Sequence, residues 1–554
     1  MTKKIFLMLS LICVYSICIF AQTQGKYTKL FSEKKIKQII KFLSDDGFEG
    51  RAPGSRSGEL AAKFIATRLE NYGMRGAGAE GSYFQPVALV GVKADPNTTL
   101  NVSGKNGMAS YKFADDFVAF TGAQIESVKL DSDLVYVGYG INAPEQKWND
   151  YKGSAADYRG KILVMMVNDP PATQAEPNLF GAKALTYYGR WTYKYEQAAR
   201  MGAAGVILIH TTDSAGYGWN VVRTSNGSWR YDVARTGDDK TPFLQMRSWM
   251  TEDTARKIFA QAGQNLDALR EKAKSRDFQP VNLGLRAKVD LNSQLKRLDS
   301  NNVVAVWDGS DAKLKDEYVV YTAHWDHLGI GEPNAKGDNI YNGALDNATG
   351  CASVLAIAEA LSKLPPDQQP KRSTVFLFPT AEEQGLLGAD WYSKHPLFAP
   401  EKTAANINID GGNLYGLTTD YGALGAERST MLPIVMDVLG ERKMTFAQDA
   451  HPEQGSFFRS DHFPFARIGV PSISIRSGVD YVGKPKDYAQ KTFDEFNKNN
   501  YHQPSDEFRE DWRFDGVVQM VETSFAIGLK VANAPTMPRF NPGDEFAGAQ
   551  PNRK

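Results

Sequence analysis

The amino-acid sequence predicts an α/β protein with a doubly wound, mostly parallel sheet and an inserted β-rich domain. Near-continuous apolar runs recur from residue 301 onward, among them "NNVVAVWDG", "EYVVYTAHWD" and "STVFLFPTAEE". Such runs are typical of strands that are buried on both faces of a parallel sheet. Apolar helical segments such as "GCASVLAIAEALSKL" alternate with them, which is the pattern of strand–helix–strand units.

Two amphipathic helices are expected between residues 31 and 75, on either side of the Gly- and Pro-rich loop "GFEGRAPGSRSGE". Residues 126–295 show a different pattern of expected secondary structure, with short strands such as "KILVMMVND" and the helix, turn and strand of "KYEQAARMGAAGVILIHTT". We therefore predict an inserted domain at residues 126–295. It divides the main domain into residues 22–125 and residues 296–535, and a polar tail follows at residues 536–554.

The size and charge of the chain narrow the classes of function. A chain of 554 residues is too long for one ordinary hydrophobic core and predicts two or three domains. The formal net charge is zero, and no segment is strongly basic. We therefore expect no nucleic-acid partner and no stable membrane partner, while the oligomeric state stays open.

Residues 1–21 have the composition of a secretory signal peptide. The short basic segment "MTKK" precedes the uncharged apolar run "IFLMLSLICVYSICIF", and small and polar residues follow. We expect cleavage after Ala21 and export to the periplasm or the extracellular space. A retained membrane anchor is the alternative, because the run is near the lower length of a spanning helix. Export would leave Cys351 as the single thiol, without an internal disulfide.

Polar side chains with metal-binding or acid–base chemistry follow several of the predicted strands. In a doubly wound sheet, ligands bind outside the carboxyl ends of the strands, so residues in these loops can converge on one site. We expect such a site to contain residues from four loops of the main domain and one segment late in the chain. The candidate residues are His324, Asp326, Asp346, Glu382, Glu383, Asp410 and His502.

These residue types suit zinc, which prefers imidazole nitrogens and carboxylate oxygens. Three protein ligands for each ion, with a position left open for water, are typical of catalytic zinc. Five ligands suffice for two ions if one carboxylate bridges them, as in two-metal hydrolases. Because Glu382 and Glu383 are adjacent, one can bind metal while the other serves as general base. Asp326 would hold the second ring nitrogen of His324.

Each candidate also has a structural interpretation. A lone histidine at a strand end is usually a hydrogen-bonded structural residue, and carboxylates at a helix start are favoured by the helix dipole. Asp346 can be a helix N-cap, and Asp410 can be a turn former. We interpret His327 and His462 as structural or supporting residues. The metal-site hypothesis depends on the conjunction of positions, since no single motif is strong.

Six segments of the main domain give the sequence a resemblance to a known family. The chain resembles the secreted co-catalytic di-zinc aminopeptidases, whose relatives include glutamate carboxypeptidase II, glutaminyl cyclase and the transferrin receptor. The loop and second helix before residue 75 resemble the N-terminal helices of that family, and residues 126–295 resemble a protease-associated domain. The six segments are "AHWDHLG", "GALDNATG", "PTAEEQGLLGA", "NINIDG", "SDHFPF" and "YHQPSD".

The resemblance implies that two zinc ions bind and that Asp346 bridges them. His324 and Asp410 would complete one zinc site, and Glu383 and His502 would complete the other.

The resemblance also implies roles for residues that bind no metal. Glu382 would act as the general base, and Asp326 would orient His324. Residues 460–462, in "SDHFPF", would line the pocket without binding zinc.

The function implied by the resemblance is that of an exported zinc-dependent exopeptidase acting on peptide substrates, and we expect an aminopeptidase. Acidic residues outnumber arginines around the presumed site, and carboxylates can hold the ammonium group of a free amino terminus. A carboxypeptidase of the glutamate carboxypeptidase type is the alternative enzyme. A silent peptide-binding or receptor-like protein is the alternative from another class, and the complete ligand set argues against it.

Overall fold

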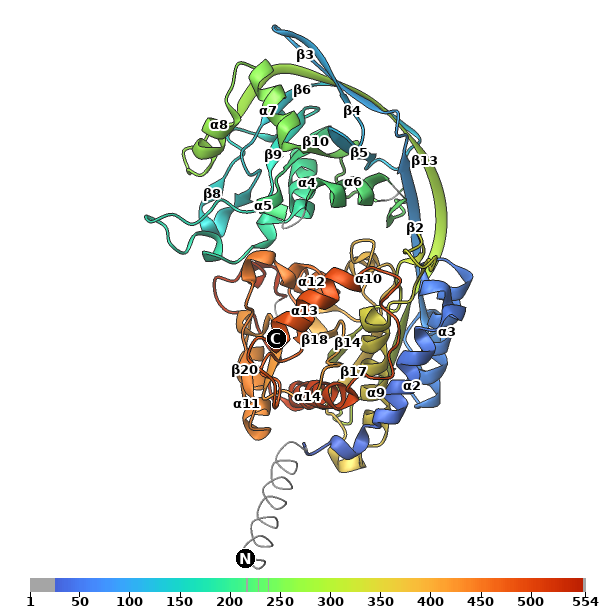
Figure 1. Ribbon diagram of the computed structural model, residues 1–554. Coiled ribbons are helices and arrows are strands. Elements are labelled where there is room, and N and C mark those ends of the chain that lie inside the picture. Colours follow the sequence, from blue (N-terminus) through green and yellow to red (C-terminus); the bar gives the residue numbers. More distant parts are fainter. Residues whose placement is uncertain (1–24, 216–217, 228, 238, 552–554) are drawn as a thin grey trace, which may run out of the picture. The chain divides into compact units, whose positions relative to one another are not determined.

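The computed structural model describes residues 25–551 except residues 216–217, 228 and 238 (Figure 1). The expected signal peptide at residues 1–21 therefore lies outside the described residues. The chain divides into two compact units. The first unit comprises Met1–Val87, Ser300–Asp449 and Ser460–Lys554, and the second comprises Ala88–Asp299 and Ala450–Arg459.

A sheet with a parallel centre forms the middle of the first unit. Four neighbouring strands run parallel. Parallel strands need long crossover connections, and each connection between these strands is long enough to carry the chain back across the sheet. This arrangement confirms the predicted α/β class. The four strands, in spatial order, are β17 (Ser373–Phe378), β14 (Tyr318–Thr322), β18 (Thr403–Ile409) and β21 (Ser472–Arg476).

Antiparallel pairs extend this sheet on both sides. Beyond β17 lie the last residues of β13 (Val281–Trp307) and then β1 (Arg75–Gly76), both paired antiparallel. Beyond β21 lies β19 (Asp420–Leu424), which pairs antiparallel with β21 and parallel with β20 (Thr445–Ala447). The central strands are thus covered on both edges.

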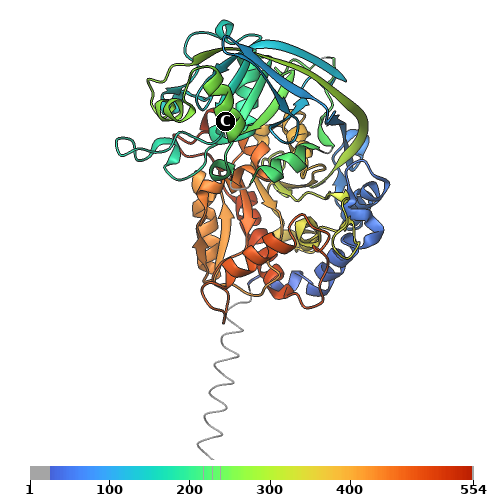
Figure 2. The same ribbon diagram turned by 45° about the horizontal axis from the view of Figure 1, so that its top comes forward.

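Helices cover both faces of this sheet (Figure 1 and Figure 2), because successive side chains of each strand point to opposite faces. On β17, Phe376 and Phe378 join the cluster of the larger helices, whereas Val375 and Leu377 pack with two shorter helices. The larger helices are α2 (Glu33–Leu43), α3 (Arg56–Asn71), α9 (Thr349–Ser362), α11 (Met431–Glu441) and α14 (Phe514–Asn533). The shorter helices are α10 (Leu387–Lys394) and α12 (His462–Arg467).

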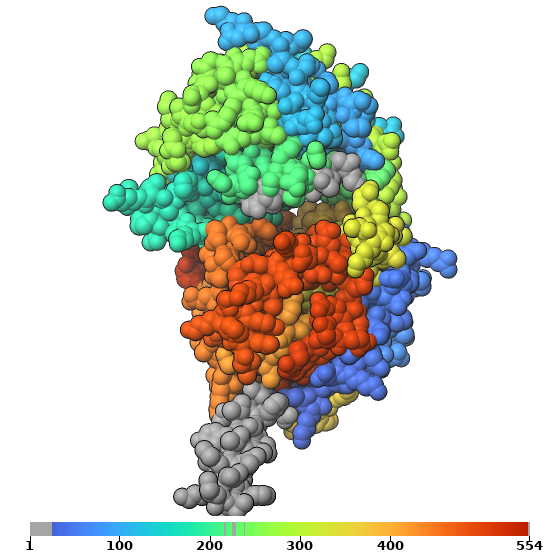
Figure 3. All heavy atoms as spheres, viewed as in Figure 1, coloured from blue at the N-terminus to red at the C-terminus, as the bar shows by residue number. Residues whose placement is uncertain are grey.

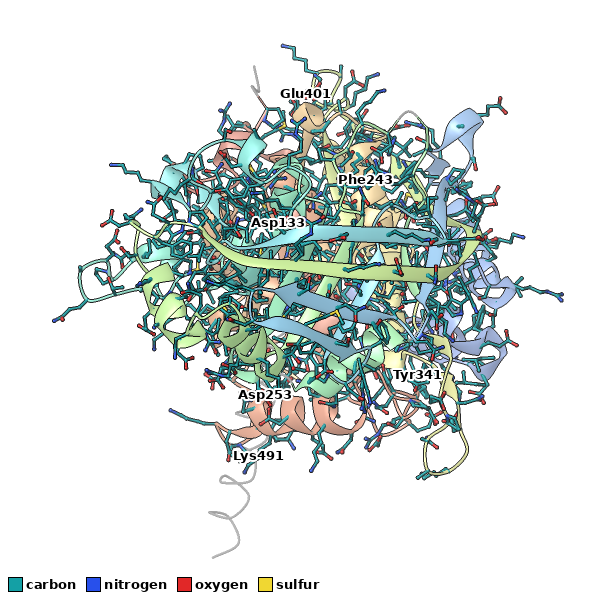
Figure 4. The ribbon with its side chains drawn as sticks, turned by 90° about the horizontal axis from the view of Figure 1, so that it is seen from above. Asp133, Phe243, Asp253, Tyr341, Glu401 and Lys491 are labelled. Carbon is teal, nitrogen blue, oxygen red and sulfur yellow. The ribbon has the colours of Figure 1, made fainter. Side chains whose placement is uncertain are left out.

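The second unit has its own sheet and its own hydrophobic cluster. Its parallel strands lie in the order β6 (Ser127–Tyr136), β9 (Ile162–Met166), β10 (Gly205–His210) and β12 (Met246–Thr251). On β13, which pairs antiparallel with β6, Arg286 donates hydrogen bonds to Asp131 and Asp133 at 2.9 and 3.1 Å. Figure 4 labels Asp133 on β6.

This unit begins at Ala88, earlier than the expected residue 126. The reason is that three strands before residue 126 pair inside it: β3 (Thr99–Gly104) with β13 and β4 (Gly107–Lys112), and β5 (Phe117–Thr121) with β12. Its likeness to a protease-associated domain stays a prediction.

The segment after α14 also differs from expectation, because it packs on the first unit instead of forming a polar tail. Phe540 and Phe546 are 6% and 5% exposed, and Phe540 forms a β-bridge with Ser429. Arg428 pairs with Asp544 at 3.0 Å. Two aromatic side chains therefore anchor a segment whose overall composition is polar.

Helix α13 (Tyr488–Asn499) lies on the surface of the first unit and contains no buried residue (Figure 3). None of the helices in the described ranges is long and apolar enough to cross a membrane.

Ile407 of β18 offers a test of the core of the first unit, since its side chain is 0% exposed. Ile407→Ala should lower the free energy of unfolding by about 2–5 kcal/mol, because it removes buried methyl groups and leaves a cavity. Ile330→Ala is the matched control, since Ile330 is 57% exposed, and it should change stability by less than about 0.5 kcal/mol. Denaturant unfolding of the full chain measures both, and equal losses would contradict this assignment of the core.

Candidate metal centre

The polar residues selected from the sequence come together at the carboxyl ends of the parallel strands in the first unit. The loops after β14, β17 and β18 supply five of them, the segment before α9 supplies one, and the segment after α13 supplies one. All of them are joined by short distances between side-chain nitrogen and oxygen atoms or by hydrogen bonds to neighbouring backbone. They are His324, Asp326, Asp346, Glu382, Glu383, Asp410 and His502.

His324, Asp346 and Asp410 form one compact group of donor atoms. The Nε2 atom of His324 lies 3.3 Å from Oδ1 of Asp346 and 3.3 Å from Oδ1 of Asp410. Its Nδ1 atom lies 3.1 Å from the backbone oxygen of Asp326 and 3.9 Å from the Asp326 carboxylate. That carboxylate accepts a hydrogen bond from the backbone N–H of Glu382 at 3.1 Å. Asp326 thus contacts His324 more closely through its carbonyl than through its carboxylate.

Glu383 connects two histidines. Its Oε1 atom lies 2.5 Å from Nδ1 of His327, and its Oε2 atom lies 2.9 Å from Nε2 of His502. The Nε2 atom of His502 also lies 3.4 Å from Oδ2 of Asp346. Asp346 therefore offers one carboxylate oxygen to His324 and the other to His502, and it belongs to both groups.

Their surroundings shift the pKa values of the adjacent residues Glu382 and Glu383 in opposite directions. Burial raises the pKa of Glu382 well above its ordinary value; His324 acts against this effect, whereas Asp410 and Glu383 add to it. Burial and Asp346 would also raise the pKa of Glu383, but His502 and His327 outweigh them and lower it to about 2. Two carboxyl groups whose pKa values are driven apart are suited to different chemical roles.

The donor set fits a divalent metal ion such as zinc. Three groups of these side chains have donor atoms within 4.8 Å of one another: His324 with Asp346 and Asp410, His324 with Glu382 and Glu383, and His327 with Asp346 and Glu383. Buried carboxylates are costly unless they are paired with cations or bind a metal. Neither oxygen of the fully buried Asp461 beside this cluster has a hydrogen-bond partner within the described ranges.

The structure brings further residues to the site that the sequence analysis did not assign to it. His327, interpreted from the sequence as a structural or supporting residue, contacts Glu383. Asp506, four residues after His502, accepts hydrogen bonds from the backbone N–H groups of Leu345 and Asp346, each at 3.0 Å. The only signal for Asp506 was its place in the segment "YHQPSD" beside a candidate ligand.

Tyr501 stacks on His502 with ring centroids 3.9 Å apart, and the pattern of the sequence contained no sign of this contact.

Residues 302–525 match the family model described as Peptidase family M28. We call these residues the M28 segment. All six segments on which the expected resemblance depended lie inside the M28 segment, so the resemblance to zinc peptidases is confirmed for this part of the chain.

Several relatives of the M28 segment are proteins of greater length. The vacuolar membrane protease of Clavispora lusitaniae is 26% identical over 207 residues, which cover 36% of this chain and 17% of that protein. The vacuolar membrane protease of Schizosaccharomyces pombe is 25% identical over 200 residues, which cover 34% and 18%. The chain thus spans less than a fifth of the length of these relatives.

A similar solved structure is the aminopeptidase from Aneurinibacillus sp. strain AM-1, with 18% identity and a TM-score of 0.49. That alignment covers 93% of this chain and 97% of the other.

The expected periplasmic or extracellular location is wrong by these comparisons, because the curated relatives are named for the vacuolar membrane. The expectation came from one apolar run near the amino terminus. A run of that length can serve as a cleaved signal or as a retained segment, since both need only an uncharged apolar stretch.

The histidines of the centre predict that metal binding releases protons. Burial opposes the charged form of His502, but Glu383 and Asp346 outweigh it and raise its pKa well above the ordinary value. The pKa of His324 is raised in the same way by Glu382, Asp346 and Asp410. Metal-free protein at neutral pH therefore holds protons that zinc must displace, since zinc binds neutral imidazole. The affinity for zinc should rise as the pH rises through these raised pKa values.

Calorimetry of zinc binding in buffers with different ionisation enthalpies counts the released protons. The variant His502→Gln should release fewer of them. The control is His451→Gln, which changes an exposed histidine of the second unit and should release as many as the wild type. Zinc binding without proton release would contradict the raised pKa values.

Proposed function

We propose that the first unit is a two-zinc peptidase that removes residues from the amino terminus of peptides. The observation that carries this proposal is the position of Asp346, whose two carboxylate oxygens face different histidines, His324 and His502. A carboxylate between two sets of donors is the arrangement of two-metal hydrolases. The match to peptidase family M28 and the relatives named proteases support the cleavage of peptide bonds.

The ligands divide into two sets around Asp346. His324 and Asp410 would hold one zinc ion with it, and Glu383 and His502 would hold the other. Bound zinc supplies Lewis-acid chemistry for the hydrolysis of the peptide bond. The low pKa of Glu383, about 2, suits a ligand, since the carboxyl group is anionic at neutral pH.

Glu382 takes a proton from the attacking water and gives it to the leaving amine. Its carboxylate lies 3.9 Å from Nε2 of His324, beside both sets of ligands. A general base works best when its pKa lies near the working pH, and burial raises the pKa of Glu382 in that direction. Asp326 positions both neighbours, because its carbonyl faces the His324 ring and its carboxylate holds the backbone N–H of Glu382.

The side chains around the centre favour recognition of a free amino terminus. The carboxylates of Asp410 and Glu382 are 20% and 10% exposed, so a substrate ammonium group can reach them. A carboxypeptidase needs a cation, usually arginine, for the terminal carboxylate. Arg467 is paired with Asp390 at 2.7 Å, and Arg51 is 2% exposed with its donors bonded to backbone oxygens.

The roles of the adjacent glutamates can be separated by substitution. Glu382→Gln keeps the size of the side chain but removes its basicity, and it should lower kcat by a factor of about a hundred to ten thousand. It should retain the zinc of the wild type. The matched variant Glu383→Gln should lose zinc, because it removes a ligand. Metal analysis and turnover of a small peptide measure both, and loss of zinc from Glu382→Gln would mean that the two roles are exchanged.

The end of the peptide that is cleaved can be tested with one peptide in three forms: free, N-acetylated and C-amidated. Acetylation should abolish cleavage, because it removes the ammonium group that the carboxylates hold. Amidation should be tolerated. The reverse result would identify a carboxypeptidase, and zinc-loaded protein that cleaves none of the three forms would favour a silent peptide-binding protein.

A further inference from the structure

We propose that Arg51 is a positioning residue that holds two loops of the metal centre in register. The inference builds on the proposed function. Arg51 lies in the segment "EGRAPGSRSG" between α2 and α3, far in sequence from every candidate ligand. We call residues 323–328 the histidine loop and residues 342–346 the aspartate loop.

The Arg51 guanidinium donates hydrogen bonds to four backbone carbonyl oxygens. Nε donates to Trp325 at 2.9 Å, Nη1 donates to Leu43 and Asn342 at 2.6 Å each, and Nη2 donates to Gly343 at 3.0 Å. The planar fork of an arginine can direct several donors at fixed angles. One side chain therefore ties the end of α2, the histidine loop and the aspartate loop together.

Both loops carry candidate ligands close to the bonded carbonyls. His324 directly precedes Trp325, and Asp346 lies three residues after Gly343. The backbone oxygen of Arg51 also accepts a hydrogen bond from the backbone N–H of His327, in the histidine loop, at 3.3 Å. A shift of this guanidinium would move His324 relative to Asp346, and the His324 Nε2–Asp346 Oδ1 distance defines the first group of donors.

The Arg51 guanidinium is buried next to groups of the metal centre. The residue is 2% exposed, and within the described ranges no carboxylate forms an ion pair with it. A buried guanidinium is unfavourable unless carbonyl groups and nearby negative charge stabilise it. Burial lowers the pKa of Arg51, and favourable electrostatic interactions with Cys351, Asp326, Asp506 and Asp346 act against that effect.

The backbone around Arg51 is specialised for this placement. Glu49 and Arg51 have φ angles of 48° and 51°, in the left-handed region that residues other than glycine rarely adopt. Such conformations persist where the surroundings hold them. A Cβ atom at Gly50 would lie 2.5 Å from the oxygen of Tyr341 and 2.6 Å from that of Gly329, so glycine is required there. The turn at Gly50 therefore packs closely against Tyr341, the residue that directly precedes the aspartate loop.

Arg372 provides a matched control, because it is another buried arginine that bonds backbone carbonyls in the first unit. It is 1% exposed, donates to the oxygens of Val531 and Ala534 at 3.1 and 2.5 Å, and pairs with Glu317 at 2.7 Å. None of these partners lies in the histidine loop or the aspartate loop. Its substitution removes comparable packing without touching the metal centre.

The experiment compares Arg51→Met and Arg51→Lys with Arg372→Met and Arg372→Lys in the full chain. Zinc affinity is measured by competition with a chromophoric chelator, the visible spectrum is recorded after loading with cobalt(II), and thermal unfolding is followed without metal. Arg51→Met should weaken zinc binding by about 10- to 100-fold, which is typical for loss of a partner that orients metal ligands. It should also change the cobalt spectrum.

Arg51→Lys keeps the charge but lacks the fork, so it should not restore the zinc affinity. The Arg372 variants should lower the unfolding temperature and leave zinc affinity and cobalt spectrum unchanged. Wild-type affinity and spectrum in both Arg51 variants would overturn the inference, as would equal losses of affinity in the Arg372 variants. If Arg51→Met does not fold, unchanged zinc affinity in Arg51→Lys overturns it. A wild-type protein that binds no zinc would instead overturn the proposed function.

Discussion

The burial of several carboxylates within a few ångströms of one another is the constraint on which the first unit depends. Like charges repel strongly where water is excluded, so each acid of the metal centre needs a cation or a hydrogen-bond donor beside it. The imidazoles of His324 and His502 supply part of this balance at 2.9 to 3.4 Å. Zinc ions in the same place would supply the remainder, which explains why an acidic cluster can persist at the end of an apolar sheet.

The loops that carry these acids are held by their backbone groups. Around Asp346, the carboxylate of Asp506 accepts hydrogen bonds from two N–H groups, while the guanidinium of Arg51 donates to the carbonyls of Asn342 and Gly343. A short irregular segment cannot satisfy its own polar groups, and buried backbone groups without partners are unfavourable. The same bonds that satisfy this backbone therefore also fix the side chain on which both sets of donors depend.

Much of this arrangement could be predicted from the sequence, and the parts that could not be predicted have identifiable physical causes. The strand ends and the seven candidate residues follow from local patterns, because a buried parallel strand has a recognisable apolar run and a site forms where such runs end. Arg51 and His327 could not be assigned in this way, since their roles depend on which distant carbonyl or carboxylate each one meets. The burial of Phe540 and Phe546 could not be predicted, because the residues around them in sequence are polar. The start of the second unit could not be predicted either, because it depends on which strands pair and no local sequence pattern indicates that pairing.

The sequence by itself determined the α/β class, the order of the strands along the chain and the set of nitrogen and oxygen donors at their ends. These properties are local, because each depends on a run of neighbouring residues. The family resemblance implied that Asp346 joins the two sets of ligands, and the tertiary structure added that its two carboxylate oxygens lie 3.3 and 3.4 Å from His324 and His502. Tertiary structure alone decided that Glu382 and Glu383 differ in acidity, although they are adjacent and of the same type. Such differences arise from distances between side chains that are far apart in sequence, and electrostatic interactions depend on those distances and on the exclusion of water.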